Sequence, residues 1–166
     1  GARAANRAAE PVADRERALL LSLGTWALIG VEAIGRTPTE RSRELTVTHE
    51  LGVDGTVRFL RNVSGMWLLE ECRRAWALED GAEPPVPDLL AAAMAAPAMA
   101  AVFDVDHPSL AAPGQSAESL SAHLVGTTPL SRGAVVRVIL ESLVARLAER
   151  VAQLEELLGT VRPVLH

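Results

Sequence analysis

The apolar residues of this chain change their spacing once, and this change limits the folds that the chain can adopt. Between residues 18 and 60 they stand in short runs or alternate with polar residues, which is the pattern of β-strands. From Asn62 onward they recur every three or four residues, which is the pattern of helices. Strands followed by helices, with one more strand after a long helix, predict an α/β domain rather than a helical bundle.

The first part of the chain predicts an antiparallel meander of about four strands. A Val53-Asp54-Gly55 turn signal separates the last two of them. A short helix that stops at Glu10-Pro11 is expected before the strands, because the residue before a proline disfavours helical geometry. The expected strands are residues 19–23, 26–33, 44–50 and 56–60.

The second part predicts several helices and a final strand that begins near Val161. The clearest helix covers residues 132–158, with Ser131 as its N-cap and Gly159 as the glycine after its end. Other helices are expected over 63–77, over a nearly uncharged stretch interrupted at Pro97, and over 116–124. One apolar stripe follows the long helix through Val136, Ile139, Leu140, Leu143, Leu147, Val151, Leu154 and Leu158.

Composition narrows the class of protein. The chain has 166 residues of which 49% are apolar, so it can bury the core of one globular domain. No apolar run approaches the roughly 18 residues that cross a bilayer, and no signal peptide is visible, so we expect a cytoplasmic protein. The net charge of -5 disfavours a nucleic-acid surface. Cys72 is the single cysteine, which excludes an intrachain disulfide and suits a reducing compartment.

Four segments in chain order carry a resemblance to a known family. They read LLSLGTWALIGVE, GVDGTVRFLRNVSGMWLLEEC, FDVDHP followed by LAAPG, and VVRVILESLVARLAERVAQLEELLG. Together they resemble the C-terminal domain of the FGGY carbohydrate kinases, and within that family the rhamnulokinase branch, over roughly residues 8–166. The resemblance implies the ribonuclease H-like fold of actin-like ATPases. It also implies ATP and Mg²⁺ as cofactors, and phosphoryl transfer from MgATP to L-rhamnulose.

Gly24-Thr25 joins two apolar strands where a bare turn would more commonly use Asn-Gly or Asp-Gly. Glycine lets the backbone approach an anion closely, and a hydroxyl can donate to it. By the resemblance, Thr25 Oγ1 and nearby N–H groups donate to the terminal phosphates of the nucleotide, and Gly24 permits the approach. Phosphoryl transfer depends mainly on such positioning and charge stabilisation. The alternative is that Thr25 is an ordinary strand or turn residue.

Two further residues acquire expected roles from the resemblance. Asn62 matches a position that contacts the sugar, although it could instead cap the following helix. Glu70 stands where the family commonly has a glutamine associated with the nucleotide. An ionised glutamate only accepts hydrogen bonds and repels phosphates. Glu70 is therefore expected either to accept from a ribose hydroxyl or to be a solvated helix residue.

Other polar residues carry weaker signals. Asp104, Asp106 and His107 could imitate a metal site, but a structural loop is the better interpretation, and we expect no metal ligands in the chain. Cys72 is expected to be a small core residue. The remaining histidines (His49, His123 and His166) are scattered and form no Ser-His-Asp pattern.

No catalytic residue is expected in this chain. The family's general base is an aspartate a little over twenty residues before the Gly-Thr turn, where this sequence has Ala2, and Asp14 is too close to the turn. We therefore expect residues 1–166 to be a partial C-terminal, nucleotide-binding domain. The N-terminal sugar-binding domain and a glycine-rich loop after the last strand are expected to be absent, and the chain alone to be inactive.

A non-catalytic interaction or dimerisation module is the competing interpretation. In that case the 132–158 helix would be the partner surface, and uncovered apolar surface would favour self-association. The apolar stripe on this helix is broader than a strict coiled-coil seam, which suits a core helix better.

Overall fold

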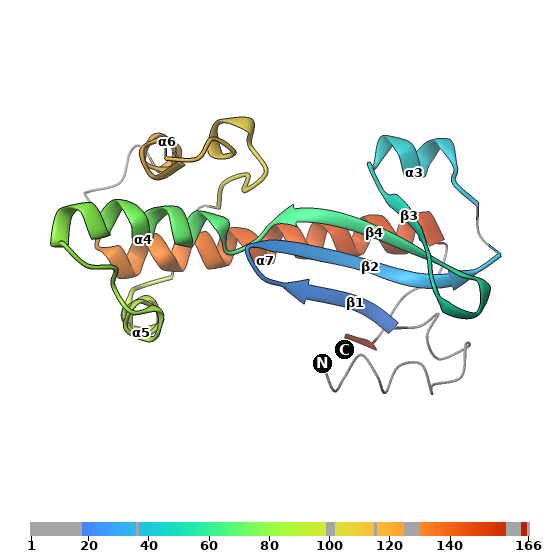
Figure 1. The fold of residues 1–166 in the computed structure, drawn as a ribbon, viewed down its shortest axis with the longest axis horizontal. Helices are drawn as coiled ribbons and strands as arrows, with labels where there is room; N and C mark the ends of the chain where they lie inside the picture. Colours follow the sequence, from blue (N-terminus) through green and yellow to red (C-terminus); the bar gives the residue numbers. More distant parts are fainter. Residues whose placement is uncertain are drawn as a thin grey trace. The chain divides into compact units, whose positions relative to one another are not determined.

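The computed structural model describes residues 18–35, 37–98, 102–114, 116–124, 130–158 and 164–165. The helix expected over residues 1–10 and the cap expected at Gly159 lie outside these ranges. The chain forms two compact units, drawn in Figure 1. The sheet unit comprises Gly1–Leu23, Ala27–Asn62 and Leu147–His166, and the helical unit comprises Gly24–Trp26 and Val63–Arg146.

The described strands are β1 (Ala18–Leu23), β2 (Trp26–Ile34), β3 (Thr48–Leu51), β4 (Thr56–Ser64) and β5 (Val164–Leu165). They form one five-stranded sheet, in which β1 pairs with β2 and β3 pairs with β4, both antiparallel, while β5 pairs with β1 in parallel. The strand order β3-β4-β2-β1-β5 shows that the predicted meander is wrong, because β4 lies between β2 and β3. The final strand expected after the long helix is confirmed.

Of the strand predicted over 44–50, the second half lies in β3 and the first half does not form a strand. A short helix, α3 (Glu40–Glu44), occupies its start because Thr39 and Ser42 form a reciprocal capping box. Thr46 then has a positive φ of 50°, which turns the chain before β3 begins. The turn signal that follows is confirmed as the 3₁₀ turn η1 (Val53–Gly55).

Close approach between strands organises the core of the sheet unit. A Cβ at Gly30 in β2 would lie 2.0 Å from the Phe59 carbonyl oxygen of β4, so only glycine fits there. Glu32 is buried among apolar neighbours and accepts a hydrogen bond from the Thr56 hydroxyl. The other buried residues of β2 are Ala27, Ile29, Val31 and Ala33.

The helical unit contains most of the predicted helices. Its helices are α4 (Trp67–Asp80), α5 (Val86–Ala95), η2 (Pro108–Leu110), α6 (Ser116–His123) and α7 (Arg132–Leu158), whose last part belongs to the sheet unit. The helix expected over 63–77 begins four residues late because β4 continues through Ser64, whereas the bounds expected for α7 are confirmed. Ser131 caps α7, since its Oγ accepts from the Ala134 N–H at 3.2 Å.

Apolar packing joins α4, α5 and the start of α7 within the helical unit. A Cβ at Gly133 would lie 2.6 Å from the Ala92 carbonyl oxygen, so α5 and α7 approach closely at that glycine. Arg132 pairs with Glu79 and Asp80 and lies 5.2 Å over the Trp76 ring. The core cluster contains Leu69, Leu89, Ala93 and Val136, with Met66, Trp76 and Leu140 packed against it.

The apolar stripe predicted on α7 is largely core. Val136, Ile139, Leu143, Leu154 and Leu158 are buried. This burial confirms that α7 is a core helix. Within the part of the chain that the structure describes, no helix combines the length and apolarity that crossing a membrane requires.

Candidate phosphate-binding site

Gly24 and Thr25 link β1 to β2. Leu23 pairs with Ala27 across the hairpin, so these two residues and Trp26, the first residue of β2, form the hairpin loop, which belongs to the helical unit. The Gly24 N–H donates to the Trp26 carbonyl oxygen at 3.0 Å and so closes the turn. All three loop residues are exposed, and Trp26 retains 60% of its surface. The Gly-Thr junction predicted from the sequence therefore faces solvent rather than the core.

The turn is fastened to the first residues of α4. The Met66 N–H donates to the Gly24 carbonyl oxygen at 2.8 Å, and the Trp67 N–H donates to the Thr25 carbonyl oxygen at 3.1 Å. These bonds occupy two main-chain donors of the helix start and hold the loop backbone against it. The loop is consequently a fixed structure of the helical unit, although its sequence neighbours on both sides belong to the sheet unit.

Where the turn meets α4, several hydrogen-bond donors have no partner among the described residues, although Leu68 and Leu69 themselves are buried. Among the described residues, none accepts from the Thr25 hydroxyl, the Thr25 N–H, or the Leu68 and Leu69 N–H groups. Met66, the N-cap of α4, provides no side-chain cap. Unsatisfied N–H groups and the positive end of the dipole make the start of a helix favourable for an anion. The hydroxyl and the helix start together form a candidate phosphate site.

Glu70 lies in the first turn of α4 and is held by an arginine. Both of its carboxylate oxygens accept from Arg73 Nη1, at 3.0 and 2.7 Å. Arg73 also donates to Glu83 at 2.9 Å and to the Pro84 carbonyl oxygen at 3.1 Å. The arginine therefore offsets the negative charge that Glu70 brings to the helix start.

Asn62 lies within β4, and its side chain is exposed. The capping role considered for it is wrong, because α4 starts five residues later and Met66 occupies the N-cap position. Asn62 is part of the sheet unit, so it is not one of the residues assembled around the turn in the helical unit.

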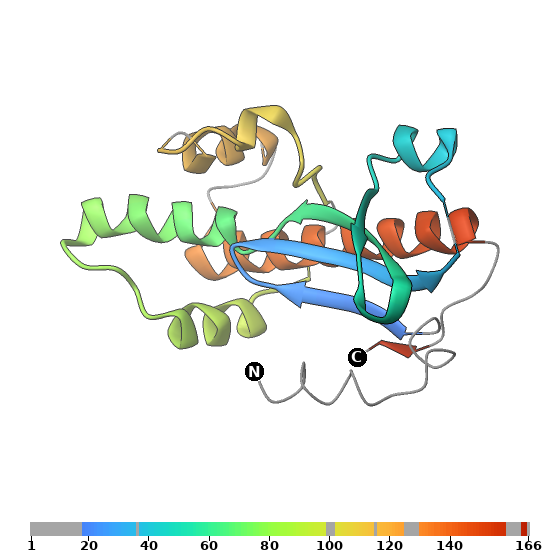
Figure 2. The same ribbon diagram turned by 45° about the vertical axis from the view of Figure 1, so that its right-hand side comes forward.

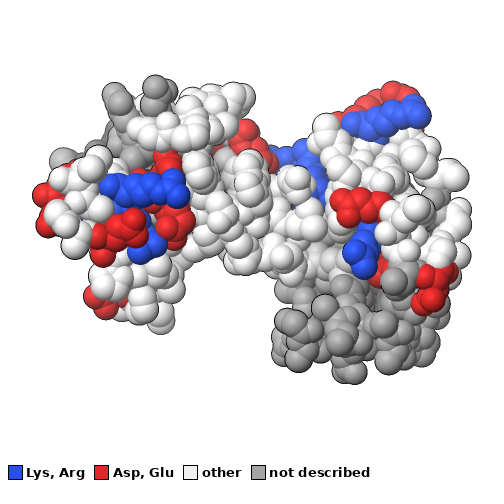
Figure 3. All heavy atoms as spheres, in the orientation of Figure 1, with Lys and Arg blue, Asp and Glu red and all other residues white. Residues whose placement is uncertain are grey.

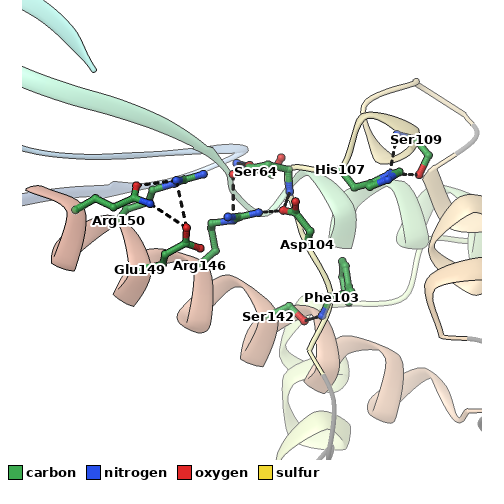
Figure 4. A network of polar contacts seen from close by, with 11 residues as sticks. Ser64, Phe103, Asp104, His107, Ser109, Ser142, Arg146, Glu149 and Arg150 are labelled. Atoms are coloured by element: carbon green, nitrogen blue, oxygen red, sulfur yellow. Dashed lines mark hydrogen bonds and ion pairs between the residues drawn. The ribbon is translucent and has the colours of Figure 1, made fainter. Parts of the chain in front are cut away.

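The two aspartates of the loop that could have imitated a metal site make structural contacts. Asp106 Oδ1 accepts from the Ser64 N–H at 2.9 Å, and Asp104 Oδ1 accepts from the Asp106 N–H at 2.9 Å. Arg146 of α7 pairs with both carboxylates, as Figure 4 shows for Asp104. The loop thus ties the end of β4 to α7. Within the described ranges, no group of three or more His, Cys, Asp or Glu side chains could hold a metal ion.

Cys72 is a buried residue of α4, as predicted. Burial raises the pKa of the Cys72 thiol to about 12, with a smaller contribution from the neighbouring Glu71 carboxylate. The thiol is therefore protonated at neutral pH and is a packing group rather than a nucleophile.

Arginines and acidic residues are interleaved on the face drawn in Figure 3. On α3, Arg41 pairs with Glu44 and Arg43 pairs with Glu40. On α4, Arg73 lies between Glu70 and Glu83. This mixture of signs fits the acidic net charge better than it fits a nucleic-acid surface.

The open amides of Leu68 and Leu69 escaped the sequence analysis. One signal could have found them: the residues that enter α4, Gly65 and Met66, include no side chain that caps a helix. Helices without such a cap leave N–H groups available to a ligand. The fastening of Gly24 and Thr25 to this helix joins positions some forty residues apart, so no local pattern could reveal it.

Comparison with known proteins assigns the chain to a protein family. Residues 19–165 match the FGGY family of carbohydrate kinases, C-terminal domain, and the chain belongs to this family. The resemblance drawn from its sequence segments is thereby confirmed.

Rhamnulokinases are among the relatives of this chain. That of Bacteroides thetaiotaomicron is 35% identical over 160 residues, which cover 95% of this chain and 31% of the relative. The rhamnulokinase of Enterococcus faecalis is 31% identical over 147 residues, which cover 87% of this chain and 29% of the relative. The rhamnulokinase of Oceanobacillus iheyensis is 28% identical over 158 residues, which cover 93% of this chain and 33% of the relative. The chain thus spans about a third of the length of these curated relatives.

Proposed function

We propose that this domain binds the nucleotide phosphates in an ATP-dependent sugar kinase. One observation carries the proposal: Thr25 is exposed on a loop that is hydrogen-bonded to the start of α4, where its hydroxyl and several main-chain donors have no partner among the described residues. The family supports a kinase, and the names of the relatives support L-rhamnulose as the acceptor. The ribonuclease H-like fold is proposed with it, on the same family resemblance.

In this proposal the Thr25 hydroxyl and N–H donate to the terminal phosphate oxygens. The Leu68 and Leu69 N–H groups and the dipole of α4 add positive potential beside them. Gly24 keeps the loop free of a Cβ where the nucleotide approaches. Mg²⁺ would be held mainly by the phosphates and water, as is usual for this ion.

Glu70 and Asn62 have secondary roles in the proposal. Glu70 contacts the nucleotide, as acceptor for a ribose hydroxyl, and Arg73 neutralises it beside the phosphates. Asn62 contacts the sugar acceptor from the exposed side of β4. Both assignments rest on the positions that these residues share with the family pattern.

The residues of this chain are proposed to bind and orient substrates, with no catalytic base among them. The position expected for that base holds Ala2, which lies outside the described residues. A coupled assay of the 166-residue chain with MgATP and L-rhamnulose should therefore give no turnover. A clear rate would show that a base is present and would overturn this part of the proposal. Self-association, also proposed, is checked by sedimentation, where a clean monomer would contradict it.

Kinetics of the longer kinase that contains this domain test the role of Thr25. Thr25→Val keeps the size and β-branching but removes the hydroxyl, and we expect kcat/KM for ATP to fall by about 100-fold, in the range for one lost transition-state donor. Thr25→Ser restores a hydroxyl and should recover most of the activity. Thr48→Val on β3 is the matched control, because the Thr48 hydroxyl donates to the Leu60 carbonyl oxygen within the sheet. Equal kcat/KM values in Thr25→Val and wild type would contradict the proposal.

A further inference from the structure

A serine hydroxyl lies between two histidine rings in the helical unit, apart from the residues proposed to bind phosphate. Ser109 belongs to η2, His107 precedes η2, and His123 ends α6, which packs against η2 (Figure 2). Ser109 Oγ is 2.8 Å from His107 Nδ1 and 3.0 Å from His123 Nε2. The ring centroids are 4.7 Å apart. Two imidazole nitrogens from separate elements therefore converge on one oxygen.

The hydrogen bonds fix which nitrogen of His107 carries a lone pair. The Ser109 N–H donates to His107 Nδ1 at 3.3 Å, so this nitrogen bears no proton in the structure. The Ser109 hydroxyl has a single proton, so it can donate to only one of the two rings and accepts from the other. The lone pair of His107 Nδ1 thus caps η2, and a metal ion bound at this nitrogen would replace that hydrogen bond.

We propose that His107 Nδ1 and His123 Nε2 form a two-imidazole site for a divalent transition metal ion such as Zn²⁺, with Ser109 Oγ and water as further ligands. Tetrahedral bonds of about 2.0–2.1 Å place two nitrogen ligands roughly 3.3 Å apart. The two nitrogens lie 2.8 and 3.0 Å from Ser109 Oγ, so an ion beside this oxygen would have a nitrogen of each ring close to it. His107 and Ser109 are exposed, which gives an ion access.

The ligand set distinguishes this ion from the Mg²⁺ of the nucleotide. Imidazole suits Zn²⁺, Ni²⁺ and Cu²⁺, whereas Mg²⁺ selects oxygen ligands. The nearby Asp104 and Asp106 carboxylates are engaged by Arg146 and by main-chain N–H groups. They do not join the site. An ion bound by the two histidines would join η2 to α6, so it should stabilise this part of the helical unit.

Calorimetric titration with ZnCl₂ tests the site on the full chain prepared without a polyhistidine tag. We expect one ion per chain, and affinity at least about 10-fold weaker in His107→Ala and in His123→Ala, since even loss of an outer-shell partner costs about 10–100-fold. Ser109→Ala keeps both imidazoles and lets water replace Ser109 Oγ, so its affinity should fall less than that of either histidine variant. His166→Ala is the control that removes a histidine from elsewhere in the sequence.

A spectroscopic measurement avoids dependence on the folding of the histidine variants. Cu²⁺ added to the His166→Ala chain should give an electron paramagnetic resonance spectrum with coupling to two imidazole nitrogens. Coupling to fewer than two nitrogens, or equal Zn²⁺ affinity in wild type and the folded double variant His107→Ala/His123→Ala, would overturn the proposal. Neither result depends on nucleotide binding, so the two proposals stand or fall separately.

Discussion

The sheet unit and the helical unit are stabilised in different ways. The sheet unit depends on strands packed so closely that Gly30 has no room for a Cβ, and its buried Glu32 is bonded to a neutral hydroxyl. In the helical unit, apolar packing joins α4, α5 and α7, and Arg132 and Arg146 add ion pairs from α7 to α4 and to the Asp104 loop. The sheet unit also has an arginine pair between elements, Arg41 of α3 with Glu156 of α7. The exposed loop at Thr25 is bonded to the start of α4 and belongs to the helical unit, although its sequence lies inside a hairpin of the sheet.

The largest expected effect is a loss of stability when a glycine packed inside the sheet is replaced, compared with a glycine in the exposed loop. Gly30→Ala places a Cβ against the Phe59 carbonyl oxygen and should lower the free energy of unfolding by about 3 kcal/mol or more, as severe overpacking does. Gly24→Ala is the matched control. Its nearest atom would be 3.7 Å away, so the change should stay within about 0.5 kcal/mol. Urea unfolding measures both. Similar losses in the two variants would contradict the assignment of Gly24 to an open loop.

The pH dependence of the free energy of unfolding tests whether the Cys72 thiol is buried in the helical unit. The chain has no lysine and no tyrosine, so between pH 9 and 11 Cys72 is the only side chain that titrates with a usual pKa in that range. Because burial raises the folded pKa to about 12, the folded chain keeps the thiol proton while the unfolded chain loses it. Stability should be complete below the unfolded pKa of about 9 and fall by about 1.4 kcal/mol per pH unit above it.

Urea unfolding at several pH values between 8 and 11 measures this slope. Cys72→Ala is the control, since it removes the titrating group and should give a flat profile. A flat profile in the wild type would show that the thiol is not held in a dry core, and the packing described for α4 would need revision.

A smaller effect is expected at Glu70. Glu70→Gln removes a negative charge from the start of α4 and should tighten MgATP binding about twofold, the effect of one unit charge about 10 Å from the phosphate in water. Glu83→Gln removes the other acidic partner of Arg73 and is the matched control, with less change expected. Fluorescence titration provides the two affinities. Unchanged affinity in Glu70→Gln would count against any contact between Glu70 and the nucleotide.

Local patterns predicted the long helix, its serine cap, the first hairpin and the turn at Val53–Gly55. Each of these is decided within a few residues by hydrophobic period, capping or turn chemistry. The start of α3 was missed because the Thr39–Ser42 capping box prevailed over an alternating pattern. The strand order was missed because pairing of β2 with β4 depends on contacts between distant residues, which periodicity does not encode.

In the candidate site, too, the local features were predicted and those that depend on distant contacts were not. The sequence and the family resemblance directed attention to Gly24 and Thr25, and the structure shows that both are exposed. The open donors of Leu68 and Leu69 depend on how the loop meets α4, which is a tertiary property. The pairing of Glu70 with Arg73 could have been predicted from their spacing, since residues three apart lie on the same face of a helix.

The most direct test of the account is an amide chemical-shift titration of the ¹⁵N-labelled chain with MgATP, with MgAMP as the comparison. If the Thr25 loop and the start of α4 bind the terminal phosphates, the N–H resonances of Thr25, Leu68 and Leu69 should move together and saturate with MgATP. They should move far less with MgAMP, which lacks those phosphates. Saturating shifts that leave these three amides unchanged, or that are equal for the two nucleotides, would contradict the central claim.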